Sequence, residues 1–88
     1  MRVLFRESFV KDVEALEDRA LRLRVRRAVI QVEQAATLKD IQNMRKLGGA
    51  DSHYRIRVGD YRLGFVFEES TVIFDRCLHR KDIYRYFP

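Results

Sequence analysis

The chain has 88 residues, of which 47% are hydrophobic and 35% are charged, and 18 Lys and Arg outnumber 13 Asp and Glu for a net charge of +5 at pH 7. This length is enough for one compact domain over residues 1–88 and too short for two, and the composition excludes a disordered chain. The basic excess favours an anionic partner, with nucleic acid as the first candidate.

Cysteine content and hydropathy predict the compartment. Cys77 is the single cysteine, so no internal disulfide can form, which favours a reducing compartment. No apolar run has the length to span a membrane, and residues 1–6 are too short and too charged for a signal peptide. Cys, His and carboxylate residues are not clustered at ligand spacing, which argues against a built-in metal site. We therefore expect a cytoplasmic protein with no metal, no other cofactor and no membrane contact.

The chain is predicted to begin with a strand and a helix. Residues 2–6 alternate polar and apolar side chains, which predicts a strand whose Val3 and Phe5 face the core. Ser8 is expected to cap the helix that follows. The apolar side chains of this helix recur at helical spacing: Phe9, Val13 and Leu16.

A second helix is predicted after Asp18, which is expected to cap it. Its apolar stripe comprises Leu21, Val25, Ala28, Val32 and Ala35, and its exposed face carries Arg22, Arg26, Arg27 and Glu33. Neither helix has the glycine-rich or polar-ligand pattern of a cofactor site. The two helices are therefore expected to form a helical hairpin packed on a sheet.

Residues 36–52 are predicted to connect the helices to that sheet, with a break at Gly48–Gly49. The segment 53–67, HYRIRVGDYRLGFVF, then alternates polar and apolar residues on either side of Gly59–Asp60. A two-residue connection that begins with glycine suits the primed turns that match strand twist. We therefore predict a tight antiparallel hairpin with Val58 opposite Tyr61.

The predicted register places Arg57 opposite Arg62 and Arg55 opposite Gly64. The other side of the hairpin is a core face: Tyr54, Ile56, Val58, Tyr61, Leu63, Phe65 and Phe67. Like charges directly opposite each other destabilise a sheet. The three arginines are therefore expected either to splay into solvent or to hold an anion, and we favour the anion site.

A last strand is predicted over residues 72–78. If it continues the meander without interruption, Asp75 lies beside Gly64 and can pair with Arg55. The same register places Arg76 on the core face, where an unpaired charge is costly. Either Arg76 sits near the edge of the sheet, or a bulge shifts the register close to it. The predicted architecture is an α+β domain: an N-terminal strand, a helical hairpin, a three-strand antiparallel meander and a short C-terminal helical turn.

The tail after the last strand brings further candidates toward Arg62. Arg80 and Tyr84 are four residues apart, so a helical turn would place both on one face. The polar sheet face and the tail together offer the following candidates: Arg55, Arg57, Arg62, His79, Arg80 and Tyr84. The sequence contains no catalytic triad, paired carboxylates or phosphate loop.

The hairpin YRIRVGDYR and the ending HRKDIYR resemble the RelE family of bacterial and archaeal toxins, within the RelE/ParE superfamily of type II toxin–antitoxin systems. The resemblance covers nearly the whole chain. It implies a RelE-like, microbial RNase-like fold and metal-independent, ribosome-dependent cleavage of messenger RNA in the A site, which inhibits translation. It also implies neutralisation by a cognate antitoxin in a toxin–antitoxin hetero-oligomer. In such enzymes the ribose 2′-hydroxyl attacks the adjacent phosphate.

The resemblance also implies roles for particular residues. Arg62 and Arg80 resemble the family's arginines on the third strand and just after the last strand. Tyr84 resembles the catalytic tyrosine near the C-terminus, although it lies closer to Arg80 than in some members, and a tail aromatic packed on the sheet stays the alternative. His79 is the other candidate proton carrier, because imidazoles exchange protons near neutral pH. The residues expected to bind RNA are Arg55, Arg57, Lys46, Lys81 and Arg85.

Two rival functions remain for the same scaffold. A ParE-like inhibitor of DNA gyrase would act by binding a protein and would need no arginine and tyrosine constellation. A catalytically inactive homologue would bind RNA through the same basic face without cutting it. The combination of Arg62, Arg80 and Tyr84 favours the nuclease.

Overall fold

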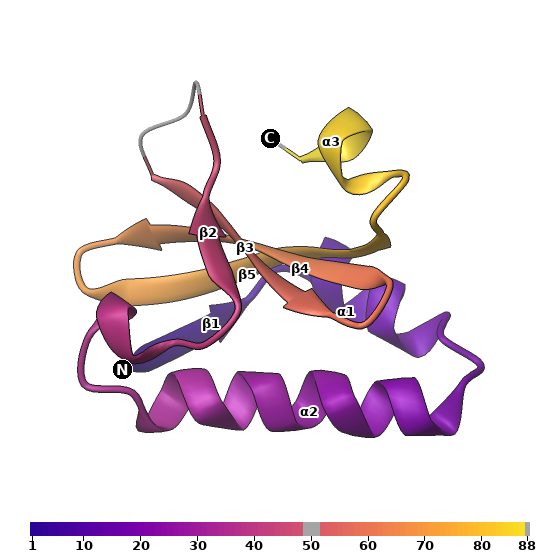
Figure 1. Cartoon of the computed structure of the whole chain (residues 1–88), viewed down its shortest axis with the longest axis horizontal. Coiled ribbons are helices and arrows are strands. Elements are labelled where there is room, and N and C mark those ends of the chain that lie inside the picture. Colours follow the sequence, from indigo (N-terminus) through magenta and orange to yellow (C-terminus); the bar gives the residue numbers. More distant parts are fainter. Residues whose placement is uncertain (49–51, 88) are drawn as a thin grey trace.

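The computed structural model describes residues 1–48 and 52–87, so Gly49 of the predicted break lies outside the described residues. The elements in chain order are β1 (Arg2–Phe5), α1 (Glu7–Glu14), α2 (Arg19–Gln34), the 3-10 turn η1 (Leu38–Asp40), β2 (Met44–Lys46), β3 (His53–Val58), β4 (Tyr61–Glu68), β5 (Thr71–His79) and α3 (Ile83–Tyr86). Figure 1 shows α2 along one side of the sheet and α3 on the other.

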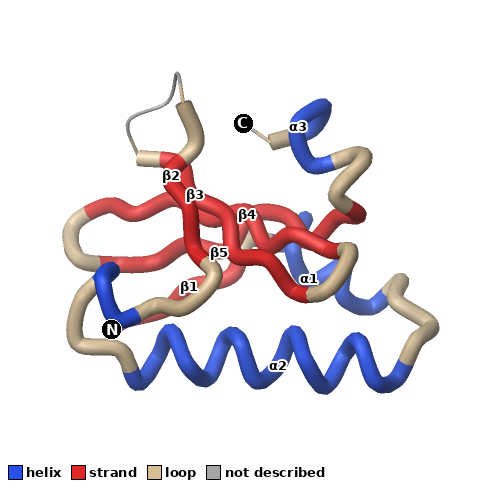
Figure 2. The backbone as a smooth tube through the Cα atoms, in the orientation of Figure 1, coloured by secondary structure: helices blue, strands red, loops and turns tan. Residues whose placement is uncertain are grey.

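Within the described residues, five strands form one sheet in the order β1-β5-β4-β3-β2 (Figure 2). β1 is parallel to β5, and the other neighbouring strands are antiparallel. The predicted α+β architecture is confirmed. The sequence missed β2, which lies inside the predicted connection and has only three residues. No helix in this part of the chain is long and apolar enough to cross a membrane.

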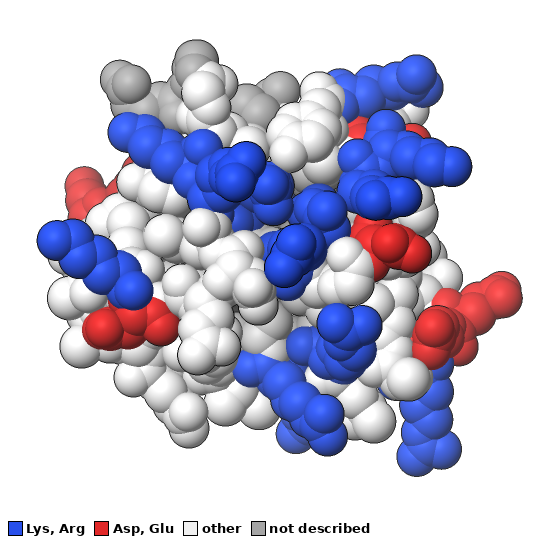
Figure 3. Space-filling view, in the orientation of Figure 1, with Lys and Arg blue, Asp and Glu red and all other residues white. Residues whose placement is uncertain are grey.

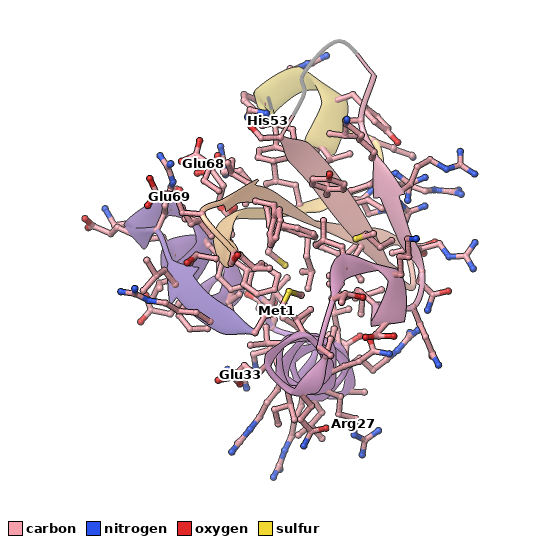
Figure 4. The ribbon with its side chains drawn as sticks, turned by 90° about the vertical axis from the view of Figure 1, so that its left-hand side faces the viewer. Met1, Arg27, Glu33, His53, Glu68 and Glu69 are labelled. Carbon is pink, nitrogen blue, oxygen red and sulfur yellow. The ribbon has the colours of Figure 1, made fainter. Side chains whose placement is uncertain are left out.

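A main hydrophobic core lies between the sheet and the two long helices, and the predicted stripe of α2 contributes to it. Val25 and Val32 are buried in this core. The carboxylate of Asp18 accepts a hydrogen bond from the backbone N–H of Leu21 at 3.1 Å, which confirms the predicted cap. The N-terminal amine of Met1 donates to the carbonyl of Glu33 at 2.7 Å, which ties the start of β1 to the end of α2 (Figure 4).

The prediction that Ser8 caps the first helix is wrong. The helix α1 begins at Glu7 after Arg6 as its N-cap residue, so Ser8 lies inside the helix. The Ser8 hydroxyl instead donates to the carbonyl oxygen of Asp75 at 2.6 Å. Phe5 faces the core as predicted, because its ring stacks against the buried Phe74 with centroids 5.7 Å apart, but it lies at the rim and stays 48% exposed.

The central hairpin has the predicted register. Val58 pairs with Tyr61, Arg57 with Arg62 and Arg55 with Gly64. Gly59 has a φ of +59°, as the first position of a primed turn requires. The turn chemistry therefore fixes the register of all cross-strand pairs in β3 and β4.

The pairing of β5 with β4 contains a bulge, which the uninterrupted register did not include. Phe74 pairs with Phe65, but Arg76 already pairs with Gly64, so Asp75 is the extra residue. The predicted pair between Asp75 and Arg55 is therefore wrong. Asp75 accepts from Ser8, and Arg76 leaves the core face, which is the bulge alternative left open by the sequence.

Asp12 of α1 holds the bulged strand in place. Its carboxylate accepts from Arg76 Nε at 2.8 Å and from the backbone N–H of Cys77 at 2.9 Å. The strand β1 pairs with β5 only as far as Phe74. The backbone N–H of Cys77 therefore bonds to the Asp12 side chain and not to a neighbouring strand. The hydrogen bond to Asp12 raises the pKa of Arg76.

We expect Asp12→Ala to lower the free energy of unfolding by about 2–3 kcal/mol, somewhat below the ~3–5 kcal/mol seen when one partner of a fully buried ion pair is removed. The matched control is Glu7→Ala on the same helix, because Glu7 pairs with Lys11 at 3.1 Å between highly exposed side chains. Such pairs contribute only about 0.3–0.5 kcal/mol. Urea unfolding of both variants measures the difference, and equal losses would contradict the role of Asp12.

Candidate functional site

The three hairpin arginines line a hollow on one side of the sheet. This arginine hollow has a volume of about 230 Å³ and is lined by Asn43, Met44, Arg45, Arg55, Arg57 and Arg62. Figure 3 shows Lys and Arg side chains gathered on this face of the molecule. The antiparallel register is the cause, because it places Arg55, Arg57 and Arg62 on the same side of β3 and β4.

Arg62 is fixed in position by the hairpin turn. Its Nη1 donates to the carbonyl oxygens of Gly59 and Tyr61, each at 2.9 Å. Partial burial lowers the pKa of Arg62, and the positive charge of Arg55 lowers it further. The charges of Arg57 and Arg80 act in the same direction. The cationic side chains are therefore close enough to disfavour one another, and an anion among them would relieve that repulsion.

Tyr84 also lies within electrostatic reach of Arg62. Its effect on the pKa of Arg62 is opposite to that of the arginines, because a phenolate attracts a guanidinium. The Tyr84 side chain is 61% exposed, so it is not the packed tail aromatic that the sequence left as an alternative. Tyr84 therefore lies outside the lining of the arginine hollow but within electrostatic reach of Arg62, with its ring exposed.

Arg55 contributes a donor with no protein partner. Its Nε is buried and makes no hydrogen bond within residues 1–48 and 52–87. A buried donor left unpaired costs free energy, whereas an anionic oxygen beside it would form a charge-assisted hydrogen bond. This donor favours the anion site over the solvated face.

The tail is positioned by backbone contacts and by its own apolar residues. The backbone N–H of Arg80 donates to the carbonyl of Asp60 at 2.7 Å, which ties Arg80 to the turn beside Arg62. Ile83 and Phe87 are fully buried against Leu47 and Val66 in a second, smaller hydrophobic cluster. This cluster anchors α3 and leaves Tyr84 exposed.

Gly64 is required by the packing of Phe87. An added Cβ at this position would lie 2.6 Å from Cδ2 of the Phe87 ring. Any side chain at position 64 would therefore collide with Phe87 in its observed position. Gly64 thus leaves the space in which the Phe87 ring of the C-terminal tail packs on the sheet.

His79 is not brought to the arginine hollow. It pairs with Tyr61 across the sheet, whereas Arg62 pairs with Leu78, so His79 and Arg62 point to opposite faces. Its ring packs edge-on to Tyr61 at 5.5 Å, and its Nδ1 accepts from the backbone N–H of Lys81 at 3.1 Å. The bulge at Asp75 is the physical reason, because one extra residue reverses the face of every later side chain in β5.

The basic residues predicted to bind RNA are divided between surfaces. Arg55 and Arg57 line the arginine hollow, and Lys81 and Arg85 are exposed on the tail outside that lining. Lys46 pairs with Tyr54, so it points away from the hollow, while its neighbour Arg45 pairs with Arg55 and lines it. The sequence missed Arg45 and Asn43, and the signal that would have found them is the three-residue strand β2.

The described residues give little support for catalysis by a cysteine nucleophile or for a metal site. Cys77 is buried, and burial raises the pKa of its thiol to about 12, so the nucleophilic thiolate does not form near neutral pH. Within the described part of the chain, no three His, Cys, Asp or Glu side chains gather as a metal site would need.

Known toxins match almost the whole chain. Residues 3–84 match the family described as "ParE toxin of type II toxin-antitoxin system, parDE". The chain is 40% identical over 89 residues to "Toxin RelE3" of Methanocaldococcus jannaschii, and the match covers 100% of both chains. The chain belongs to the RelE/ParE family of type II toxins. It is a toxin of a type II toxin–antitoxin system.

Solved structures agree with this assignment of the toxin. A chain of the RelB–RelE antitoxin–toxin complex from Methanococcus jannaschii matches with a TM-score of 0.81 and 38% identity, covering 97% of the toxin and 99% of that chain. A chain of the archaeal RelE–RelB complex from Pyrococcus horikoshii matches with a TM-score of 0.72 over 90% of the toxin and 93% of that chain. The second is only 23% identical and shows the fold alone.

Proposed function

We propose that the toxin is a ribosome-dependent endoribonuclease that cuts messenger RNA in the A site and is neutralised by a cognate antitoxin. The observation that carries this proposal is the arginine hollow, in which Arg55, Arg57 and Arg62 gather on one side of the sheet, with Arg80 and Tyr84 within electrostatic reach of Arg62. The named relative, Toxin RelE3, and the RelB–RelE complex support it.

The reaction has a defined balance of bonds and protons. The 2′-hydroxyl loses its proton and forms a bond to the adjacent phosphorus. The bond from phosphorus to the 5′ oxygen breaks, and that oxygen gains a proton. The products are a 2′,3′-cyclic phosphate and a 5′-hydroxyl end. The chain must therefore stabilise extra negative charge on the phosphorane and provide a group that moves a proton.

The residues divide these tasks by their chemistry. Arg62 and Arg80 stabilise the phosphorane, because a guanidinium stays protonated and both residues are tied to the hairpin turn, Arg62 through its side chain and Arg80 through its backbone N–H. Arg55 and Arg57 hold the scissile and neighbouring phosphates. Tyr84 moves the proton, because it is the one side chain of this set that exchanges a proton, whereas a guanidinium stays protonated.

We expect Tyr84→Phe to slow cleavage by about 10²–10⁴-fold, the usual contribution of a positioned proton-transfer group. Stability and RNA affinity should change little, because the ring remains and the Tyr84 side chain is exposed. Single-turnover cleavage of a message bound to ribosomes measures the effect. Tyr86→Phe is the matched control, since Tyr86 is also exposed on α3 but lies over Arg76, 5.7 Å from its guanidinium carbon. Equal rates for the two variants would exclude Tyr84 from proton transfer.

A second candidate function follows from the family description, which is that of ParE. A ParE-like toxin would inhibit DNA gyrase. The two functions separate in one experiment with the purified toxin: a nuclease stops translation of a defined message and leaves gyrase supercoiling intact, and a gyrase inhibitor does the reverse. RNA binding that stops translation without producing new RNA ends would instead identify an inactive homologue.

The proposed antitoxin fits the charge of the site. An acidic or amphipathic segment would bind the arginine hollow or displace α3. Either contact would remove the arginine cluster from the message.

A further inference from the structure

A second polar hollow adjoins the arginine hollow on the side of α2. This α2 hollow also has a volume of about 230 Å³ and lies between α2, the residues before β2 and the strand β3. It is lined by Arg24, Arg27, Ala28, Gln31, Gln42, Asn43, Ile56, Arg57 and Val58. Asn43 and Arg57 line both hollows, so the two hollows are neighbours at this edge of the sheet. Figure 3 shows basic side chains extending from the sheet down over α2.

Arg24 connects the α2 hollow to the turn that holds Arg62. The Arg24 guanidinium packs so closely against Gly59 that an added Cβ there would lie 2.8 Å from its Nη1. The carbonyl of the same Gly59 accepts from Arg62. The two arginines therefore flank one turn, and a ligand that passes Arg62 can continue toward Arg24.

The lining of the α2 hollow suits a nucleotide. Its arginines can bind phosphate oxygens, and its three amides, Gln31, Gln42 and Asn43, can both donate to and accept from the edge of a base. None of its lining residues is acidic. The apolar side chains of Ile56 and Val58 are buried in the sheet beneath, so the accessible chemistry of the hollow is basic and amide.

We propose that the α2 hollow binds the RNA nucleotide next to the phosphate held in the arginine hollow. This inference rests on the proposed function, because it assumes that RNA enters the arginine hollow. Single-stranded RNA of the message and exposed ribosomal RNA present the same phosphate and base chemistry. The orientation of the exposed arginines of α2 separates the site from the rest of the helix: Arg24 and Arg27 line the polar hollow, and Arg22 and Arg26 line an apolar groove toward α1.

The test compares three proteins: the unchanged toxin, a double variant that carries Arg24→Ala and Arg27→Ala, and a control double variant that carries Arg22→Ala and Arg26→Ala. Both pairs remove the same charge from the same helix. Fluorescence anisotropy with a labelled single-stranded RNA of about ten nucleotides, measured over a salt series, gives the affinity and its salt dependence. Sedimentation with ribosomes gives the second arm. The single variant Arg27→Ala is also measured, because Arg24 packs against Gly59 and its removal could change the hairpin turn.

The proposal predicts that the Arg24 and Arg27 pair weakens RNA binding about tenfold or more, and that the slope of log affinity against log salt falls by roughly 0.7 for each lost phosphate contact. Arg27→Ala alone should lose part of this affinity, and the control pair should keep it. A loss confined to the ribosome arm would identify ribosomal RNA as the ligand. If the two double variants bind RNA and ribosomes equally well, the α2 hollow is not a nucleotide site. Arg62→Ala would still test the arginine hollow separately. A parent toxin that binds neither RNA nor ribosomes overturns both.

Discussion

Arg62→Ala is expected to abolish toxicity without unfolding the protein. Removing one preorganised electrostatic stabiliser of a transition state costs about 10²–10³-fold in rate. Stability should change little, because the loss of the two hydrogen bonds from Arg62 to the hairpin turn is offset by removal of the like charge opposite Arg57. Growth arrest on expression and thermal unfolding of the purified variant measure the two quantities.

Arg80→Ala is expected to give the same loss, and Arg22→Ala on the exposed face of α2 is the control for general loss of positive charge. A toxic, soluble Arg62→Ala variant would show that the proposed site is wrong. A variant that loses toxicity only because it unfolds would show that Arg62 serves the fold and not the reaction.

Gly64→Ala is expected to unseat the C-terminal tail. The added Cβ would collide with the ring of Phe87, which is fully buried. Displacing that ring forfeits most of its burial, and losing a buried Phe side chain costs about 3–5 kcal/mol. Without the clash, Gly to Ala in a strand would stabilise by roughly 0.5–1 kcal/mol. Unfolding in urea therefore gives the sign of the effect directly.

A double-mutant cycle with Phe87→Ala isolates the cause. If the clash with Phe87 is responsible, Gly64→Ala should be neutral or stabilising once the ring is gone. Each single variant should also lose cleavage, because α3 carries Tyr84 and is anchored by Phe87. If Gly64→Ala were just as destabilising in the Phe87→Ala background, the tail would not be the reason for the glycine.

The sequence was sufficient for the parts of the fold that local chemistry decides. The Gly59–Asp60 turn sets the register of β3 with β4, and that register alone gathers Arg55, Arg57 and Arg62. The cap at Asp18 and the apolar stripe of α2 also follow from local pattern.

The remaining parts depend on contacts between residues far apart in the chain. The bulge at Asp75 is held by Ser8 and Asp12, more than 60 residues earlier, so no local pattern around β5 reveals it. That single bulge moves Arg76 off the core face and His79 away from the arginine hollow. Likewise, the exposure of Tyr84 follows from the burial of Ile83 and Phe87, a choice that composition leaves open.

Mapping RNA ends tests whether the arginine hollow is a ribosome-dependent nuclease site. A translation reaction with a defined message is run with the toxin, with Arg62→Ala and with ribosomes omitted, and new 5′ ends are located by primer extension. We expect cuts at A-site codons that disappear without ribosomes and weaken strongly in Arg62→Ala. Normal translation with no new ends would contradict this expectation.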